Sequence, residues 1–342
     1  MVWLDEIKQQ PEALRDFCSE LKENGSWVEK VSKMNFKKVL LTGMGSSLFA
    51  CGVAECYLRK NGIFATSLDS ENVMNTSMSL IDDETLVVAI SQSGESPEVV
   101  KLTGMIENKD NLIVIVNYKN SRVYNCGGTV IPVCCGLENY SSSKSYTNTL
   151  AAVIAFAKVF VAKKDVRDEV IKGLLSAAKE TERIFETEIG KEFGEALEDT
   201  GCLYCVGGGY AYTSATHMEL IGEETAKFYG SRYTPGQFIH GPIELIRPGF
   251  NVLSFNTQPD FYESMAIVCN NVIEYGGKVL MVTDNREIKA TDKMQVFYVD
   301  FEEDIYASIV EIVPFELAYD YYTIKKGGNP GFLSRVVKRI VK

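Results

Sequence analysis

The chain has 342 residues, enough for two α/β domains of typical size, and its 46% hydrophobic and 24% charged residues are ordinary for a globular protein. The net charge of −11, with no long basic run before the C-terminal tail, argues against nucleic-acid binding. The N-terminus lacks the basic region and apolar core of a secretory signal, and no apolar stretch approaches the roughly 20 residues of a membrane span, so we expect a cytoplasmic protein that contacts no membrane.

The first half of the chain alternates between strand and helix patterns. Residues 1–30 have helix-compatible spacing and are expected to form an N-terminal helical arm. This alternation predicts a doubly wound parallel sheet in a first domain at residues 31–164. Its strands are expected where short apolar runs occur, at 37–43, 64–68, 85–90, 112–116 and 129–133.

The same pattern restarts in the second half of the chain. Residues 165–199 are charged and helical, and are expected to connect two domains. A second domain is then expected at residues 200–342, with one long helix at 305–325. Its strands are expected at 201–207, 251–255, 278–282 and 295–299. The predicted fold class is therefore α/β, with two doubly wound, flavodoxin-like parallel-sheet domains in tandem.

The most distinctive loop follows the strand predicted at 85–90. The loop Ser91–Ser96 carries three hydroxyls and a glycine, and Pro97 then stands at the first position of the next helix. Hydroxyls and free backbone N–H groups at a helix N-terminus attract a dianion. Because the loop has no lysine, it suits holding a phosphate better than transferring one; an ordinary capped turn is the alternative.

The second half lacks a comparable loop. At the corresponding position it has Asn256-Thr257-Gln258-Pro259, with one hydroxyl, no glycine and a proline that removes a backbone donor. We therefore expect one phosphate site per chain, in the first domain.

Two further polar turns lie in the first half. The segment 43–47 begins like a dinucleotide fingerprint, but Leu48 replaces the third glycine and Asp69 is only loosely spaced for a ribose contact. A hydroxyl-bearing turn that faces Ser91–Ser96 is therefore favoured over NAD binding. Residues 140–147 form either a third hydroxyl cluster or a serine-rich helix start.

Two histidines and a pair of glutamates are the candidate proton carriers. His240 lies at a Gly-Pro turn between an expected extended segment and an expected helix, where a proton carrier is accessible. His217 falls in the middle of an expected helix, where a structural role is favoured. Glu223 and Glu224 are adjacent on a helix and point roughly 100° apart, so at most one can face a site.

The cysteines do not predict a metal site. There are nine, an odd number, and most lie in apolar runs. Cys202 and Cys205 have redox or zinc spacing but no second pair to complete a tetrahedral site. Buried free thiols in a reducing compartment are the favoured interpretation.

Four of these motifs, taken together, resemble the sugar isomerase (SIS) family, specifically the double-SIS isomerase half of glucosamine-6-phosphate synthase. They are the loop Ser91–Ser96, the turn Gly45-Ser46-Ser47, Ser142-Ser143-Lys144 before a threonine-containing helix, and Phe238-Ile239-His240-Gly241-Pro242. The similarity covers about residues 35 to 340. Any one motif is weak alone, whereas the set is specific.

The resemblance implies a substrate and a set of roles. In the family a glutamate moves a proton between C1 and C2 of an open-chain sugar phosphate, and counting back without gaps from His240 places that glutamate at Glu224. The histidine, contributed by the neighbouring subunit of a homodimer, assists ring opening, and no cofactor is implied. The implied phosphate ligands are Ser91, Gln92, Ser93 and Ser96, and the implied sugar ligands are Gly45, Ser46, Ser47, Ser142 and Lys144.

Three departures from the family pattern refine the expected activity. The chain has no N-terminal cysteine or glutaminase domain, so glutamine-dependent synthesis is not expected of this chain alone. Ile221 replaces the family's lysine three residues before the glutamate. Arg335 takes the place of the C-terminal lysine, with Lys338 a nearby substitute, and arginine can clamp an oxygen but cannot form a Schiff base.

These departures favour relatives that cleave or deaminate phosphorylated amino sugars and fructosamine adducts. We therefore expect a cofactor-independent enzyme that acts on a 6-phosphorylated amino sugar or fructosamine, with Glu224, His240 and Arg335 as catalytic residues and a C-terminal tail that closes the active site. A simple aldose–ketose isomerase and a non-catalytic sugar-phosphate sensor are the alternatives.

Overall fold

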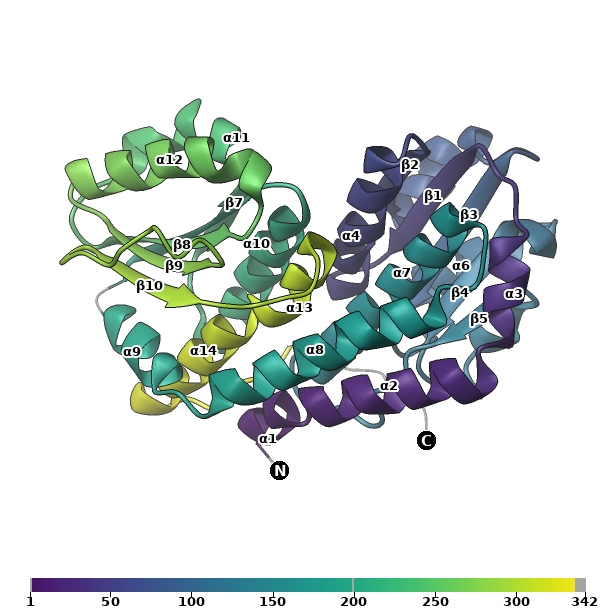
Figure 1. The fold of residues 1–342 in the computed structure, drawn as a ribbon, viewed down its shortest axis with the longest axis horizontal. Coiled ribbons are helices and arrows are strands. Elements are labelled where there is room, and N and C mark those ends of the chain that lie inside the picture. The colour runs from purple at the N-terminus through teal and green to yellow at the C-terminus, as the bar shows by residue number, and fades with distance from the viewer. Residues whose placement is uncertain (1, 199, 336–342) are drawn as a thin grey trace. The chain divides into compact units, whose positions relative to one another are not determined.

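The computed structural model describes residues 2–198 and 200–335, and in them it shows two five-stranded sheets in which every pairing is parallel (Figure 1). The strand order is β2-β1-β3-β4-β5 in the first sheet and β7-β6-β8-β9-β10 in the second. Both orders are the flavodoxin-like 2-1-3-4-5 arrangement. The predicted fold class is confirmed.

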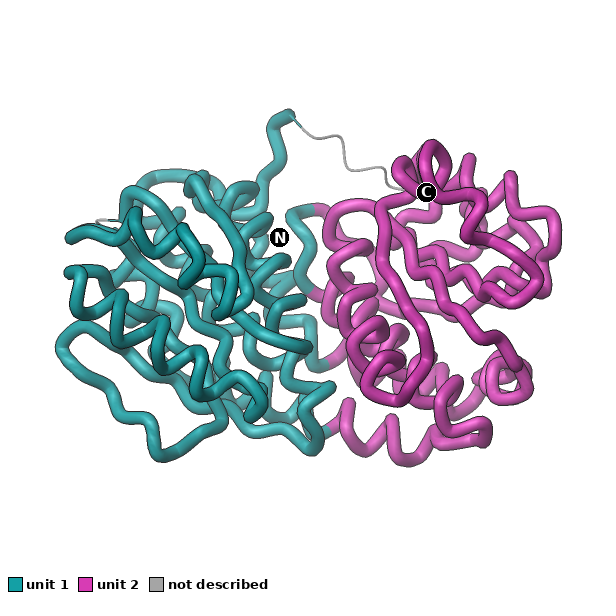
Figure 2. Tube along the Cα trace, turned by 90° about the horizontal axis from the view of Figure 1, so that it is seen from above, with its two compact units in different colours: residues 1–11, 140–143, 176–335 teal, residues 12–139, 144–175, 336–342 magenta. Residues whose placement is uncertain are grey.

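The chain divides into two compact units, coloured separately in Figure 2. Unit 1 consists of residues 1–11, 140–143 and 176–335, and unit 2 of residues 12–139, 144–175 and 336–342. Each unit holds one sheet. The predicted domain boundaries stay a prediction, and the two units are described separately below.

Unit 2 contains the first sheet. Its strands β3 and β4 are buried along their whole length, as their continuous apolar sequences predict. The elements are most of α2 (Gln10–Asn24), α3 (Ser26–Ser32), β1 (Lys38–Gly43), α4 (Ser46–Lys60), β2 (Phe64–Asp69), α5 (Ser70–Asn72), β3 (Thr85–Ser91), α6 (Pro97–Met105), β4 (Leu112–Val116), β5 (Thr129–Pro132), α7 (Lys144–Ala162) and the start of α8 (Arg167–Phe185).

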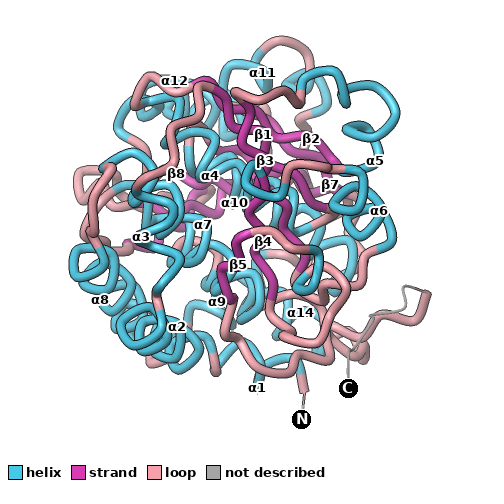
Figure 3. The backbone as a smooth tube through the Cα atoms, turned by 90° about the vertical axis from the view of Figure 1, so that its right-hand side faces the viewer, coloured by secondary structure: helices cyan, strands magenta, loops and turns pink. Residues whose placement is uncertain are grey.

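Helices cover the first sheet on both faces (Figure 3). Helix α7 packs against α3 and α4, while α6 contacts α5 and contributes Val99 to an apolar cluster with Val87 and Ala89 of β3. Among the described residues, α7 alone has the length and apolarity of a membrane span, and 89% of its most apolar window is buried inside the protein. Our expectation that no stretch approaches that length was wrong for this helix, whose burial is that of a core helix.

Unit 1 contains the second sheet. In Figure 1, α11 and α12 lie on one side of this sheet, and α9, α10 and α14 lie on the other. The elements are α1 (Trp3–Lys8), the end of α8, α9 (Ile189–Ala196), β6 (Cys202–Gly207), α10 (Tyr210–Ile221), β7 (Gly230–Tyr233), α11 (Pro235–Ile239), β8 (Phe250–Asn256), α12 (Tyr262–Glu274), β9 (Lys278–Thr283), β10 (Met294–Tyr298), α13 (Ala307–Val310) and α14 (Val313–Lys325).

Three local expectations for unit 1 were incomplete or wrong. The edge strand β7 was missed, because its sequence Gly-Ser-Arg-Tyr is short, polar and only partly buried. The helix expected at 305–325 is divided into α13 and α14, since Pro314 has no N–H to continue the first helix and instead lies in the first turn of the second. The segment before His240 is helix α11 rather than extended chain; Thr234 caps it and Pro235 begins it.

Candidate functional site

The order in which strands are added to the first sheet reverses between β1 and β3. Strand β2 is added beside β1 on one side, whereas β3 and then β4 are added on the other side. At the carboxyl ends of these two adjacent strands, Gly43 leads into the N-terminus of α4 and Ser91 leads into the N-terminus of α6. In open α/β sheets, such a switch point is where ligands bind. The turn Gly45-Ser46-Ser47 and the loop Ser91–Ser96 therefore lie at the same place in the sheet.

The loop Ser91–Ser96 is held in shape by its own hydroxyls. The Ser91 Oγ accepts a hydrogen bond from the Gly94 N–H at 3.1 Å and lies 3.2 Å from the Ser96 Oγ. The Ser93 Oγ accepts a hydrogen bond from the Glu95 N–H at 3.2 Å. Ser96 precedes α6, and its side chain makes no capping bond to that helix. The three hydroxyls are thus gathered at a helix N-terminus, where the helix dipole favours an anion.

Gly94 cannot be replaced by a larger residue without changing the loop. Its φ of +65° lies in the left-handed region that favours glycine. A Cβ added there would overlap the side chain of Ser121, which follows β4. This close approach joins the loop after β3 to the loop after β4.

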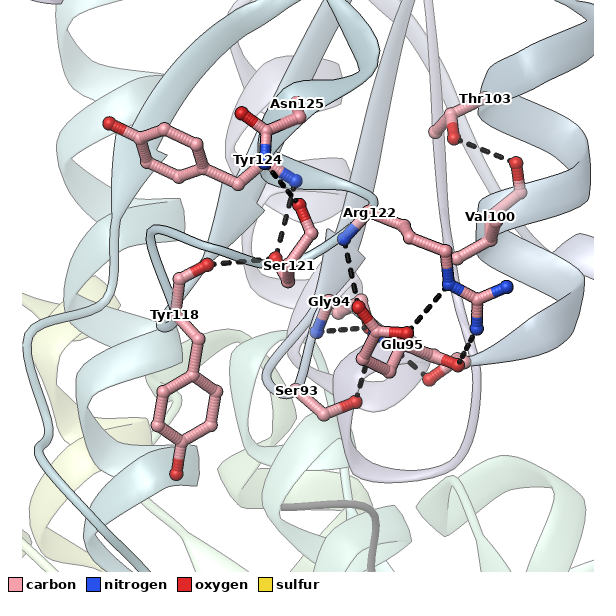
Figure 4. A network of polar contacts seen from close by, with 12 residues as sticks. Ser93, Gly94, Glu95, Val100, Thr103, Tyr118, Ser121, Arg122, Tyr124 and Asn125 are labelled. Carbon is pink, nitrogen blue, oxygen red and sulfur yellow. Dashed lines mark hydrogen bonds and ion pairs between the residues drawn. The ribbon is translucent and has the colours of Figure 1, made fainter. Parts of the chain in front are cut away.

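Residues 117–126 support the loop at several further points, several of which Figure 4 shows. The Val123 N–H donates to the Gly94 carbonyl at 3.0 Å, and Arg122 donates from its backbone N–H and its Nε to the two carboxylate oxygens of Glu95, at 2.9 and 2.6 Å. The Ser121 Oγ donates to the Tyr118 carbonyl at 2.8 Å. Sequence reasoning missed this support, although a polar run directly after a buried strand signals a loop at the same sheet edge.

Asn117 makes a second connection to the loop Ser91–Ser96. Its backbone N–H donates to the Gln92 carbonyl at 3.2 Å. Its side chain accepts from the Cys135 N–H at 3.0 Å and donates to the Gly136 carbonyl at 2.8 Å. Burial raises the pKa of the neighbouring Tyr118, Cys135 raises it further, and a hydrogen bond with the Gln92 side chain lowers it. Asn117 therefore links the loop to the segment after β5.

The turn Gly45-Ser46-Ser47 depends on the backbone conformation of its glycine. Gly45 has a φ of +52°, and an added Cβ would meet no atom within 4 Å, so conformation and not space requires the glycine. Ser46 is the first residue of α4, and both Ser46 and Ser47 are partly exposed. Asp69, weighed as a ribose ligand, instead caps α5 by accepting from the Asn72 N–H at 2.9 Å.

Within unit 1, Ser141, the neighbour of Ser142, is hydrogen-bonded to Gly331 near the C-terminus of the described chain. The Ser141 N–H donates to the Gly331 carbonyl at 2.9 Å, and the Trp3 indole N–H donates to the Ser141 carbonyl at 3.0 Å. Arg335 follows on the same segment and is exposed. Ser142 and the tail that carries Arg335 are therefore neighbours by way of Ser141. Lys144 belongs to unit 2, where it is the buried first residue of α7.

Glu224 lies in a π-helical turn, Gly222–Ala226, that continues α10. Such turns are rare and occur often at functional sites. The turn is held against α14, since Gly222 leaves room for the Tyr319 ring and the Thr323 hydroxyl donates to the Thr225 carbonyl at 3.4 Å. Glu224 is partly buried in this turn.

Glu223 faces a different environment from Glu224. Burial raises the pKa of Glu223, the Glu219 carboxylate raises it further, and Arg232 lowers it. Arg232 is itself ion-paired with Glu219. Glu223 therefore lies close to the Glu219–Arg232 pair of α10 and β7, and the assignment of Glu224 to the site stays a prediction.

The two histidines differ in accessibility. His240 is the exposed residue that ends α11. His217 is completely buried in α10, and burial lowers its pKa to about 3, so its ring is neutral near pH 7. The contrast agrees with a structural role for His217.

At the corresponding edge of the second sheet, the polar side chains contact other groups of unit 1. The Thr257 hydroxyl after β8 donates to the buried Glu311 carboxylate. The Gln258 side chain donates to the Thr257 carbonyl at 2.9 Å. A Cβ on Gly208, directly after β6, would overlap the Phe261 ring. The hydroxyl of Thr257, which is the one hydroxyl of residues 256–259, is therefore bonded within unit 1.

The structure thus gathers the predicted site residues into two groups. Unit 2 holds Gly45, Ser46, Ser47, Ser91, Gln92, Ser93, Ser96 and Lys144, and unit 1 holds Ser142, Glu224, His240 and Arg335. Lys338 lies outside the described residues.

Within residues 2–198 and 200–335, no three His, Cys, Asp or Glu side chains are arranged to hold a metal ion, and all nine cysteines are free thiols.

Part of the chain matches a known domain family, and the whole chain is similar to known proteins. Residues 34–159 match the model of the SIS domain. The glutamine–fructose-6-phosphate aminotransferase (isomerizing) of Clostridium tetani is 23% identical over 341 residues, which cover 95% of this chain and 56% of that protein. The chain therefore spans a little over half the length of the curated relative it matches.

Two solved structures share the fold. The C-terminal domain of glucosamine-fructose-6-phosphate aminotransferase from Francisella tularensis has a TM-score of 0.86 at 20% identity, covering 96% of this chain and 97% of that one. Glucosamine-6-phosphate deaminase from Thermotoga maritima has a TM-score of 0.75 at 18% identity, covering 99% of each chain. The match at residues 34–159 thus identifies an SIS domain in the first half of the chain, and the solved structures share the fold of the whole chain.

Proposed function

We propose that this chain is a phosphosugar enzyme that acts on a 6-phosphorylated amino sugar or fructosamine by moving a proton between C1 and C2. The observation that carries the proposal is the loop Ser91–Ser96, whose hydroxyls converge at the N-terminus of α6 on the switch point of the first sheet. The names of the relatives, which include an isomerizing aminotransferase and a sugar-phosphate deaminase, are compatible with this substrate class.

The phosphate anchors the substrate in this proposal. Ser91, Gln92, Ser93 and Ser96 hold it, so that C1 and C2 are presented at a fixed distance from C6. Gly45, Ser46, Ser47, Ser142 and Lys144 contact the sugar. In this proposal the loop holds the phosphate and takes no part in bond making.

The chemistry falls to three residues of unit 1. Glu224 removes a proton from one of the two carbons and returns it to the other, through an enediol or enaminol. His240 protonates the ring oxygen or the departing amine, and in the proposed cytoplasmic homodimer it comes from the neighbouring subunit. Arg335 holds a substrate oxygen as a fixed cation. Water then hydrolyses the resulting imine, which is at C1 for a fructosamine and at C2 for a 2-amino sugar, to a hexose phosphate and an amine or ammonia.

The test is a substrate panel with two variants. The protein is incubated with fructose-6-phosphate, glucosamine-6-phosphate and a fructosamine-6-phosphate, and products are followed by NMR. We expect turnover of an amine-bearing substrate that falls at least about 100-fold in both Glu224→Gln and His240→Asn, because each removes one proton carrier. Glu223→Gln is the matched control and is expected to remain within about threefold of wild type.

The remaining outcomes separate the alternatives. Turnover of fructose-6-phosphate alone identifies a simple aldose–ketose isomerase and contradicts the proposed substrate. Tight binding of sugar phosphates with no turnover identifies a sensor and contradicts an enzyme. Full activity in Glu224→Gln contradicts the proposed base.

A further inference from the structure

The loop Ser91–Ser96 is cross-linked to the loop after β4 by one ion pair, Glu95–Arg122. Figure 4 shows the two side chains facing each other. Arg122 makes three contacts with Glu95: its backbone N–H and its Nε donate to the two carboxylate oxygens at 2.9 and 2.6 Å, and its guanidinium donates to the Glu95 carbonyl at 3.4 Å. A carboxylate held at both oxygens has little freedom to rotate. The pair therefore restrains the backbone of Glu95, the residue before Ser96.

The pair also resolves an electrostatic conflict. Glu95 introduces a carboxylate into a loop whose hydroxyls and helix N-terminus favour an anion. An uncompensated carboxylate there would repel a phosphate dianion. Arg122 neutralises that charge from the neighbouring loop, and the contact spans 27 residues of sequence.

We propose that Glu95 and Arg122 are positioning residues for the phosphate loop: the pair fixes the loop's backbone and cancels the one carboxylate within it. The inference rests on the proposed function for its ligand, a sugar phosphate. Neither side chain is assigned a contact with the substrate. Gly94 completes the arrangement, because it allows Ser121 to pack directly against the loop.

The chain contains a closely matched control pair. Glu55 and Arg59 on α4 form an ion pair at 2.6 Å with side-chain exposures of 57% for arginine and 19% for glutamate. Glu95 and Arg122 also pair at 2.6 Å, with exposures of 56% and 20%. A partly exposed pair contributes little to stability as such. If variants of Glu95 or Arg122 bind ligand differently from variants of Glu55 or Arg59, the difference therefore reflects the loop that the Glu95–Arg122 pair restrains.

The binding experiment is a double-mutant cycle read by calorimetry with fructose-6-phosphate and with inorganic phosphate. Arg122→Ala leaves the Glu95 charge uncompensated, and we expect the dissociation constant to rise about tenfold or more. Glu95→Gln loses the ion pair but also the repulsive charge, so a rise of about threefold is expected. The double variant should resemble Glu95→Gln, because removing the carboxylate relieves Arg122→Ala. Glu55→Gln should bind as wild type.

Two results would overturn the proposal. If Arg122→Ala binds as tightly as wild type, the pair positions nothing. If the double variant binds as weakly as Arg122→Ala, then Arg122 is itself a phosphate ligand or the substitution damages the fold. Where turnover is measurable, KM should rise and kcat remain within about threefold, since the phosphate is held equally in the ground and transition states.

A second measurement tests the Glu95–Arg122 cross-link in the absence of ligand. Amide hydrogen exchange across residues 92–96 should be about tenfold faster in Arg122→Ala than in wild type, and unchanged in Glu55→Gln. If wild type binds no sugar phosphate, the proposed function fails while this comparison still decides whether the pair orders the loop. Equal exchange in wild type and Arg122→Ala contradicts the cross-link.

Discussion

Gly94 combines three requirements in one residue. Its φ is positive, its N–H donates to the Ser91 hydroxyl, and its missing side chain admits Ser121 from the next loop. A larger residue fails the first and third requirements together. The hydroxyl geometry of the loop therefore depends on a residue that has no functional group of its own.

We predict that Gly94→Ala weakens sugar-phosphate binding by at least about tenfold, because the left-handed backbone costs a non-glycine residue about 1–2 kcal/mol and the added Cβ displaces Ser121. Calorimetric titration with fructose-6-phosphate measures the change. Gly104→Ala in α6 is the control, since an added Cβ there meets no atom within 4 Å. That control should bind normally and unfold at the same or a higher temperature. Normal binding by Gly94→Ala would contradict the role of the loop backbone.

The break between α13 and α14 places a carboxyl group in the interior of unit 1. Glu311 follows α13, is completely buried, and accepts a hydrogen bond from Thr257 at the end of β8. Burial raises its pKa from 4.5 to about 7, although hydrogen bonds from Ser214 and Thr257 oppose the shift. A continuous helix through 305–325, as the sequence predicted, would not have required this turn.

Glu311 should make stability depend on pH. Its folded-state pKa is above its unfolded value, so between about pH 4.5 and 7 the folded chain retains a proton that the unfolded chain has released, and stability falls as pH rises through this range. Glu311→Gln cannot ionise. We expect it to be more stable than wild type at pH 8 by about 1–3 kcal/mol, and similar to wild type at pH 4.5.

Urea denaturation at pH 4.5 and pH 8 measures this difference. Glu29→Gln is the control, because Glu29 is exposed and its pairing with Lys33 is at the surface. Asp320, whose pKa burial raises to about 6, contributes a decline in the same direction to all three proteins. An equal stability difference at both pH values would show that Glu311 is not ionised by pH 8.

The two sheets share one topology but have different chemistry at their switch points. The first carries hydroxyls in a loop shaped by backbone hydrogen bonds. The second carries the contacts of Thr257, Gln258 and Phe261 with neighbouring groups of the same unit. A repeated fold therefore does not imply a repeated site.

We predict that the chain binds about one sugar phosphate per chain, because one switch point out of two presents hydroxyls to a ligand. Calorimetry with fructose-6-phosphate gives the stoichiometry. The variant Ser91→Ala/Ser96→Ala should abolish the binding heat, since it removes two of the three loop hydroxyls. Two ligands per chain, or binding retained in this variant, would contradict a single site in the first unit.

Local sequence was sufficient for the strands other than β7 and for their parallel arrangement in two sheets. Strands such as β3 and β4 are short apolar runs whose burial follows from hydrophobicity alone, and Pro97 marks the start of α6. The contiguous motifs of the first half, such as Gly45-Ser46-Ser47 and Ser91–Ser96, were sufficient to indicate the SIS domain that matches residues 34–159.

Only the tertiary structure showed which residues contact the loop Ser91–Ser96 and which residues pack at the end of β8. The contact of Arg122 with Glu95 and that of Ser121 with Gly94 join residues 27 positions apart. The burial of Glu311 against Thr257 joins residues 54 positions apart. Local periodicity does not encode such contacts, because they arise from how separate loops pack at one edge of a sheet. The hydroxyls of the loop were therefore identified from its own residues, whereas its contacts with the loop after β4 were found only in the tertiary structure.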